Sequence, residues 1–290
     1  MTSVTNGSAT GSATGPTTGP TTGDAAAAKT AGRPVPSIAI RARDLLASEW
    51  TKFRSVRSTF WVLLVAVVSP VAVSALVAFA FSSAKASGPP PDPLLPGVLS
   101  LEYAVIAVSV LGVLAFSSEF STGLIRTTFA AAPRRRAVLA AKVMVLGVVT
   151  LVVGEVVVFA SFFLSQAILS GHGLGVSLSR PGVPGKVLAA GLMLCVCTLL
   201  GLALGAIIRH TAGGIAATVA VIVLPATAGF LPSPWDGRIG RFTLLDAVRQ
   251  VSALHPASNL FSPGWSLLVL LAWPAAGLAV SAVLITRRDV

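Results

Sequence analysis

Six long apolar stretches are the feature that most restricts how this chain folds. A helix needs about 20 mostly apolar residues to cross the hydrocarbon core of a bilayer. Inside that core the backbone N–H and C=O groups must be hydrogen-bonded within the protein, which favours helices. The pattern predicts an all-α polytopic membrane protein with six transmembrane helices. The predicted spans are residues 60–81, 97–116, 138–164, 187–208, 211–231 and 265–286.

Charged residues are scarce and lie between the apolar stretches. They make up 11% of the chain against 54% for hydrophobic residues, whereas a soluble domain carries about a quarter charged residues. The formal net charge of +11 comes from short basic strips that flank the spans. This distribution is typical of membrane topology and argues against nucleic-acid binding, which needs a basic patch on one surface.

The basic residues also predict the orientation of the spans. If the N-terminus is cytoplasmic, most of the 21 lysines and arginines fall on the cytoplasmic side. Loops on that side of a membrane carry an excess of Lys and Arg. Both termini are therefore expected in the cytoplasm, together with the loop between the second and third spans.

The first 37 residues are rich in Thr, Gly, Ser, Ala and Pro and contain no apolar run. Such a composition cannot bury a core, so residues 1–37 are expected to form a disordered tail. The tail lacks the basic start and the apolar centre of a secretory signal.

Residues 38–58 have the spacing of an amphipathic helix that lies in the headgroup layer before the first span. The apolar arc of this helix is imperfect, because Glu49 and Arg57 fall within it. In a simpler interpretation, the aromatic and basic residues of this segment only anchor the first span. Under either interpretation the expected membrane-interface anchors are Trp50, Lys52, Arg54, Arg57 and Trp61.

No set of residues with catalytic or metal-binding spacing stands out, since the three histidines lie in separate loops. The segment RPGVPGKV is the closest approach to a phosphate-binding loop. It departs from that motif at Arg180, where Gly is needed, and at Val187, where Ser or Thr is needed. We therefore expect no directly bound cofactor or metal, and no enzymatic activity in the chain itself.

One acidic residue, Glu155, lies deep in the third predicted span. A carboxylate near the middle of a membrane is energetically costly, so it should face the bundle or a water-filled cavity. Two interpretations stay open for Glu155. It faces a substrate or cation in a translocation path, or it makes an interhelical hydrogen bond that fixes packing.

Two other segments carry structural predictions. The motif GLALG at residues 201–205 allows two helices to approach closely, and it is expected to serve packing within the bundle. The mixed apolar and charged residues 239–254 predict a short helix at the outer face, on which Asp246 and Arg249 are spaced to pair.

The loop between the second and third spans, SEFSTGLIRTTFAAAPRRRAVLAAK, resembles the corresponding loop of ABC-transporter permeases of the type 2 exporter class. The stretch SEWTKFRSVRSTFW before the first span is similar to the entry segment of a bacterial branch of that class. With the six spans, the resemblance covers roughly residues 38–290, although three consecutive arginines exceed the pattern. The matching positions in the loop are Glu119, Gly123, Ile125, Thr127, Pro133, Arg134 and Lys142.

The resemblance implies that residues 59–290 form a six-helix permease domain in a bacterial plasma membrane. Residues 118–136 would form a coupling helix that docks on a separate ABC ATPase subunit, present in two copies. A second permease copy or a paralogue would complete the translocation path, and membrane lipids would surround it. ATP and Mg would be bound by the partner ATPase, not by this chain.

The residues of the loop agree physically with such a role. Gly123 permits a tight turn, and Pro133 ends a helix and turns the chain back to the membrane. Leu124, Ile125 and Phe129 supply one apolar face for a partner. The arginines from Arg134 onward suit contacts with acidic groups on the ATPase or with lipid phosphates, and simple retention on the cytoplasmic side explains them equally well.

Three other functions stay open at this stage. An ion-gradient-driven secondary transporter would use Glu155 for coupling. A membrane-embedded enzyme would need clustered polar residues at one membrane face, and the sequence offers no convincing cluster. A non-transporting anchor or sensor subunit would use the same helices without moving a substrate.

Overall fold

The computed structural model describes residues 42–83, 92–131, 135–227 and 235–287, together with the single residues 15 and 232. Contacts between residues divide the chain into two units, 1–39 and 40–290. The predicted tail, apart from residue 15, lies outside the described residues, and so do residues 38–41 of the predicted amphipathic helix.

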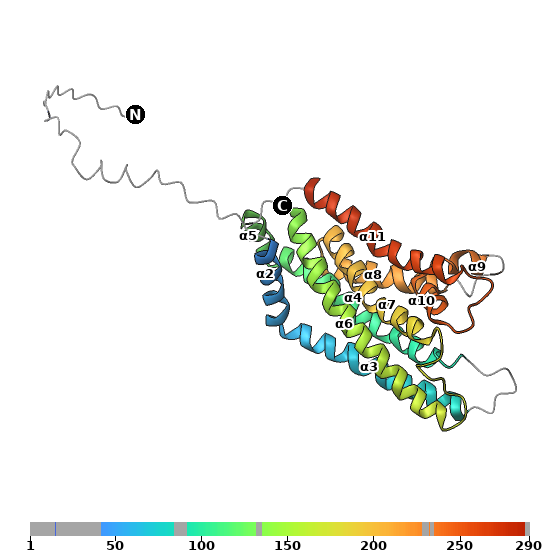
Figure 1. Cartoon of the computed structure of the whole chain (residues 1–290). Helices are drawn as coiled ribbons and strands as arrows, with labels where there is room; N and C mark the ends of the chain where they lie inside the picture. Colours follow the sequence, from blue (N-terminus) through green and yellow to red (C-terminus); the bar gives the residue numbers. More distant parts are fainter. Residues whose placement is uncertain are drawn as a thin grey trace, which may run out of the picture. The chain divides into compact units, whose positions relative to one another are not determined.

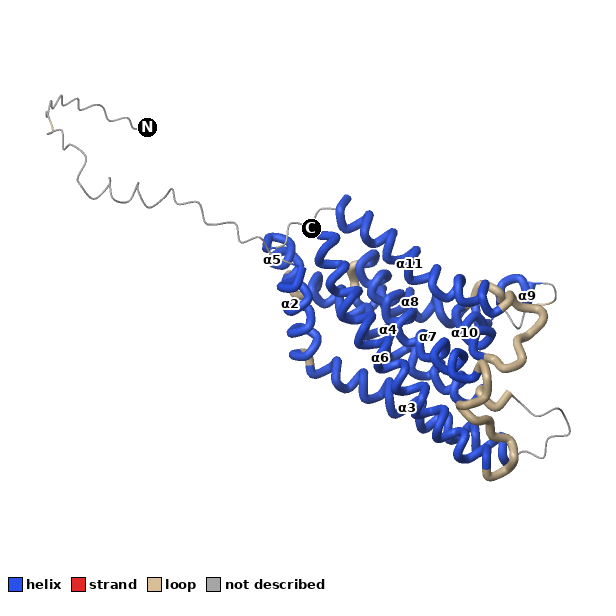
Figure 2. The backbone as a smooth tube through the Cα atoms, in the orientation of Figure 1, coloured by secondary structure: helices blue, strands red, loops and turns tan. Residues whose placement is uncertain are grey.

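The described part of the second unit contains helices and no strands, which confirms the predicted all-α class (Figure 2). The helices are α2 (Ala42–Ser55), α3 (Arg57–Ser83), α4 (Leu95–Ser121), α5 (Leu124–Ala131), α6 (Arg135–Ser170), α7 (Val183–Ile208), α8 (Thr211–Ala226), α9 (Trp235–Gly240), α10 (Leu244–Ser252) and α11 (Pro263–Arg287).

Five of these helices, α3, α4, α6, α7 and α11, are long and apolar enough to cross a membrane. The sixth predicted span, residues 211–231, corresponds to α8, which has 16 residues and ends at Ala226. At about 1.5 Å per residue α8 extends about 24 Å, less than the hydrocarbon core of about 30 Å. Pro225 stands in its last turn, and residues 228–231 lie outside the described part of the chain.

The helices α3, α4, α6, α7, α8 and α11 run in alternating directions, so their ends gather at two poles (Figure 1). We call the first the α5 pole: it comprises α2, α5, residues 209–210 and the last turn of α11. Thr211 donates a hydrogen bond to Ser117 there, and Arg135 donates one to the carbonyl of Ile285. The opposite α10 pole comprises residues 171–182, α9 and α10.

The most extensive contact between described helices joins α4 and α7, and glycine makes their close approach possible. A Cβ atom at Gly112 would collide with the carbonyl oxygen of Thr198, and one at Gly201 with the carbonyl oxygen of Ser109. Gly205 lies in the same way against the backbone of Val113. The GLALG motif therefore serves packing within the bundle, as predicted.

Polar contacts hold the short helices at the α10 pole. The Thr243 hydroxyl caps α10 by accepting a hydrogen bond from the backbone N–H of Asp246. Arg249 on α10 forms a 2.6 Å ion pair with Glu102 on α4 and a longer one, 3.5 Å, with Asp246. The predicted helix within residues 239–254 and its Asp246–Arg249 pair are confirmed, although two short helices form where one was expected.

The α4–α7 contact yields a test with a built-in control. Gly112→Ala should destabilise the bundle by about 1–3 kcal/mol, because the added methyl group meets backbone that cannot rotate away. Gly97→Ala on the same helix has open space around its Cβ and should leave stability unchanged or slightly raised. Cys195 and Cys197 are buried free thiols, so their reaction with a thiol-reactive dye on heating reports unfolding. Equal unfolding temperatures for the two variants would contradict this packing.

Candidate functional site

The α5 pole, which includes α2, carries the described residues expected to couple to an ATPase. The predicted helix 38–58 is present as α2 but ends at Ser55, and α3 begins at Arg57 after a break at Val56. Figure 1 shows α2 at an angle to α3, close to α5. The main contacts of α2 are with α6, so α2 packs against the bundle as well as carrying anchor residues. Its place in the headgroup layer stays a prediction.

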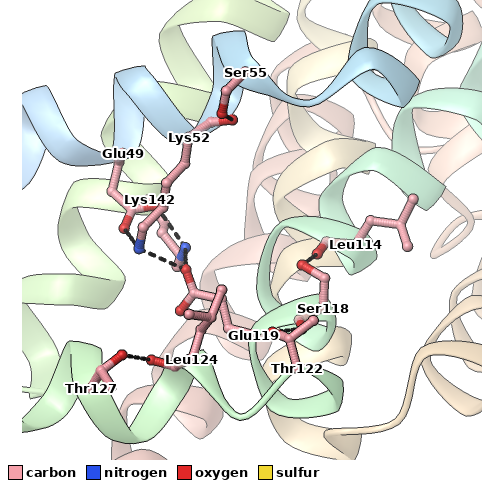
Figure 3. A network of polar contacts seen from close by, with 10 residues as sticks. All are labelled: Glu49, Lys52, Ser55, Leu114, Ser118, Glu119, Thr122, Leu124, Thr127 and Lys142. Atoms are coloured by element: carbon pink, nitrogen blue, oxygen red, sulfur yellow. Dashed lines mark hydrogen bonds and ion pairs between the residues drawn. The ribbon is translucent and has the colours of Figure 1, made fainter.

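Four charged side chains from three helices meet at this pole (Figure 3). The ammonium of Lys142 on α6 lies 2.6 Å from Glu49 Oε2 on α2 and 2.7 Å from Glu119 Oε1 on α4. The ammonium of Lys52 on α2 lies 2.9 Å from Glu49 Oε1 and 2.8 Å from Glu119 Oε1. We call these four residues the charge cluster.

Burial makes this arrangement energetically demanding. The side chains of Lys142, Glu119 and Glu49 are only 3%, 7% and 8% exposed, whereas that of Lys52 is 41% exposed. Removing charges from water costs several kcal/mol per ion unless close partners and hydrogen bonds offset the loss. Two ammonium groups and two carboxylates balance, and the ring of Phe116 lies 5.9 Å from the Lys142 nitrogen.

Lys52 is the member of the cluster that faces water most. Partial burial acts to lower the pKa of its ammonium, but the hydrogen bonds and charges of Glu119 and Glu49 act in the opposite direction and prevail. The pKa of Lys52 is therefore raised above its ordinary value, and the side chain stays charged at neutral pH.

Gly123 connects α4 to α5 in the way the sequence predicted. Its φ of +73° lies in the left-handed region, which a residue without Cβ adopts at little cost. The turn is closed by a hydrogen bond from the Gly123 N–H to the carbonyl of Phe120. The chain therefore leaves the end of α4, two turns past Phe116, and starts α5 directly beside the charge cluster.

The residues of the predicted apolar face of α5 do not all point the same way: one is buried in the bundle and another is exposed. Ile125 is buried in a core cluster with Phe116 and Leu139, so it holds α5 on the bundle. Leu124 is 54% exposed, and Thr127 is exposed with its hydroxyl bonded to the carbonyl of Leu124. The side chain of Phe129, and Pro133 and Arg134 entirely, lie outside the described residues.

The expected membrane anchors fall into two groups. Trp50 stacks on Phe53 with 6.1 Å between ring centroids, and Trp61 is exposed on the first turns of α3. Arg54 and Arg57 are exposed as well. Lys52 differs from the others, because it takes part in the charge cluster as described above.

Glu155 lies at the crossing of α6 and α7. Its carboxyl group occupies the space over Gly191, where an added Cβ would come within 2.7 Å of it, and a Cβ at Gly154 would collide with the carbonyl of Gly191. Glu155 Oε2 is buried and accepts no hydrogen bond from the described residues. The predicted interhelical hydrogen bond is thus not formed by that oxygen, and Glu155 packs against the glycine instead.

Glu49 was not among the expected functional residues, and Lys142 was expected only as a matching position of the loop. Both left a signal in the sequence. Glu49 interrupts the apolar arc of its helix, and Lys142 lies among apolar residues at the start of the third span. A charge on an apolar face indicates a buried partner, but only the tertiary structure shows which one.

The described residues contain no group of three or more His, Cys, Asp or Glu placed to hold a metal ion. Where carboxylates come together they are bridged by cations: Glu49 and Glu119 by lysines, and Glu102 and Asp246 by Arg249.

No protein-family model matches this sequence, and no curated protein matches it. Inferences about function therefore come from the residues and their geometry. What the geometry establishes is a multi-helix, membrane-type bundle with a buried charge cluster beside α5.

Replacing the cations of the charge cluster is expected to lower stability by different amounts. Lys142→Met leaves two buried carboxylates with Lys52 alone and should lower the free energy of unfolding by about 3–5 kcal/mol. Lys52→Met should cost clearly less, because water reaches its site. Arg54→Met, exposed on the same helix, serves as the control and should unfold like the wild type. Dye labelling of the buried cysteines during heating gives the unfolding temperatures of the three variants and so ranks their stabilities. An effect of Lys142→Met no larger than that of Arg54→Met would contradict the role of the cluster.

Proposed function

We propose that this chain is the permease subunit of an ATP-driven export system of the ABC type 2 exporter class. The observation that carries the proposal is the connection between α5 and the charge cluster. An exposed helix that follows a glycine turn lies beside a buried ion network joining three helices. This is the place at which the resemblance puts a coupling helix.

The geometry supplies a mechanical link for such a role. Ile125 fixes α5 to the core, and Gly123 joins α5 to the end of α4, where Glu119 stands. Glu119 is bound to Lys142 on α6 and to Lys52 on α2. Separating these buried pairs is costly, so a push on α5 moves the ends of α2, α4 and α6 together.

The rest of the system follows from the proposal. Two copies of a separate ATPase bind ATP and Mg, and their closure displaces α5 in each of two permease subunits. The α5 pole then faces the cytoplasm of a bacterium, with both termini on that side. In this arrangement α8 belongs to the sixth crossing, since α8 runs from the α5 pole to contacts with α9 and α10.

Leu124, an exposed apolar residue of α5, offers the most direct test of the proposal. Leu124→Glu introduces a charge into the proposed apolar contact and should abolish co-purification with the P-loop ATPase that the proposal requires, to be sought among the proteins encoded next to this one. Because Leu124 is exposed, the variant should still insert and unfold at the wild-type temperature. Tagged permease co-expressed with that ATPase in membranes gives the measurement.

Thr286→Glu is the matched control, because Thr286 is also exposed at the α5 pole but lies on α11. It should retain the ATPase. If Leu124→Glu retained the ATPase as well as Thr286→Glu does, α5 would not be the docking element and the proposal would be wrong.

One observation favours a second candidate, an ion-gradient-driven transporter. Glu155 Oε2 is a buried oxygen in a membrane-type helix with no hydrogen-bond partner in the described part of the chain. A carboxylate of this kind suits binding of a proton or a metal cation.

Glu155→Gln separates the two candidates. Glutamine keeps the volume over Gly191 and removes the titratable group. The readout is resistance to a compound that inhibits a strain lacking this gene more strongly than its parent, found with a panel of drugs and peptides. With the ATPase present, we expect Glu155→Gln to restore that resistance as fully as the wild type. Without the ATPase gene, we expect neither protein to restore it. Resistance restored without the ATPase, and lost in Glu155→Gln, would favour the ion-driven transporter.

A further inference from the structure

A cavity of about 370 Å³ lies at the elbow, residues 52–59, where α2 ends and α3 begins. Its walls come from the elbow, from the last turns of α4 and from α6, with Leu124 of α5 at one side. Cavities of about 300–1,000 Å³ are the size of small-molecule sites in proteins.

The lining changes from apolar to polar along the cavity. Leu111, Val145 and Leu146 are buried and make one end of the cavity apolar, whereas the buried Glu49, Glu119 and Lys142 of the charge cluster line its other end. The exposed lining residues form its mouth, and most of them are polar. Ser58 and Ser118 are exposed there, together with the half-exposed ammonium of Lys52. An apolar interior with a polar mouth fits an amphiphile, whose tail enters while its head group stays at the surface.

Charge at the mouth selects the head group. Within the charge cluster the carboxylates of Glu49 and Glu119 are balanced by two lysines. Arg54 and Arg57 on the elbow are exposed and form no ion pair with the described residues, so they add two uncompensated positive charges. Arg57 stands between Val56 and Ser58, which both line the cavity.

We propose that this cavity binds one anionic phospholipid of the surrounding bilayer. One acyl chain occupies the apolar interior beside Val62 and Leu146, and the phosphate lies at the mouth near Lys52. The exposed Arg57 is not itself a lining residue but adds its charge beside the mouth. Lysine has three N–H donors, and the Lys52 ammonium uses two of them on Glu49 and Glu119. The third is free for a phosphate oxygen.

The head group decides the specificity of this site. An acyl chain gains little by leaving the bilayer, because lipid tails are as apolar as the cavity wall. Basic pockets between membrane helices attract anionic head groups, and each Lys or Arg near the surface strengthens the attraction about fivefold. The bound lipid would fill the elbow of α2 and so support the helix that carries Glu49. This site goes beyond the proposed function and needs no ATPase.

Native mass spectrometry of the full chain, purified in detergent, tests the proposal. Phosphatidylglycerol and phosphatidylcholine with identical acyl chains are titrated in parallel. We expect one tightly bound phosphatidylglycerol per chain and at least fivefold weaker binding of phosphatidylcholine. Arg57→Gln should weaken phosphatidylglycerol about fivefold, whereas Arg287→Gln, an exposed arginine on α11 at the same pole, should not.

A second pair of variants, one of them a matched control, tests the apolar part of the site. Val62→Trp fills the cavity and should abolish the bound lipid, whereas Val65→Trp, exposed on the same helix outside the lining, should keep it. Equal binding of the two lipids, or full phosphatidylglycerol binding by Val62→Trp, would overturn the proposal.

A measurement on the wild-type chain covers the case in which Val62→Trp does not fold. Phosphatidylglycerol with a photoreactive group in its acyl chain is cross-linked to the protein in vesicles, and the adducts are mapped by peptide sequencing. Adducts on Val62, Leu111 or Leu146 are expected. Adducts confined to outward-facing residues such as Val65 and Val68 would show an ordinary lipid contact and overturn the site.

Discussion

Burial of charge at the α5 pole is the constraint on which the rest of that pole depends. The ammonium of Lys142 is almost completely enclosed and has two carboxylates within hydrogen-bonding distance, from two different helices. A buried charge tolerates little loss of geometry, because an unpaired ion in an apolar environment is far less stable than a paired one. The positions of α2, α4 and α6 are therefore tied to one another, although they are distant in the sequence.

Two kinds of contact stabilise different parts of the bundle. In the middle, α4 and α7 meet through glycines whose missing side chains let backbone touch backbone. At the α10 pole the contacts are polar. The Asp92 carboxylate, for example, accepts hydrogen bonds from the backbone N–H groups of Leu254 and His255. Close contact suits an environment without water, where dispersion and hydrogen bonds replace the hydrophobic effect between helices. Polar contacts serve the ends, where loops must be fixed.

The functional proposals rest on the same pole for different physical reasons. Coupling to an ATPase needs a surface to push and a rigid connection behind it, which Leu124 and the charge cluster supply. Lipid binding needs space and uncompensated positive charge, which the elbow and Arg57 supply. The two properties meet at α2, since that helix carries Glu49 into the cluster and Lys52 to the mouth of the cavity.

The sequence by itself determined the helical class, the approximate bounds of the five long apolar helices and the turn at Gly123. These follow from local chemistry: apolar length, and the freedom of a residue without Cβ. Only the tertiary structure decided that Glu49 reaches Lys142, 93 residues away, that Ile125 faces inward and that Glu155 packs on Gly191. Periodicity places a residue on one face of its own helix, but the partner of that face is set by how the helices pack. The short α8 shows the same limit, because an apolar run in sequence does not reveal where its last helical turn ends.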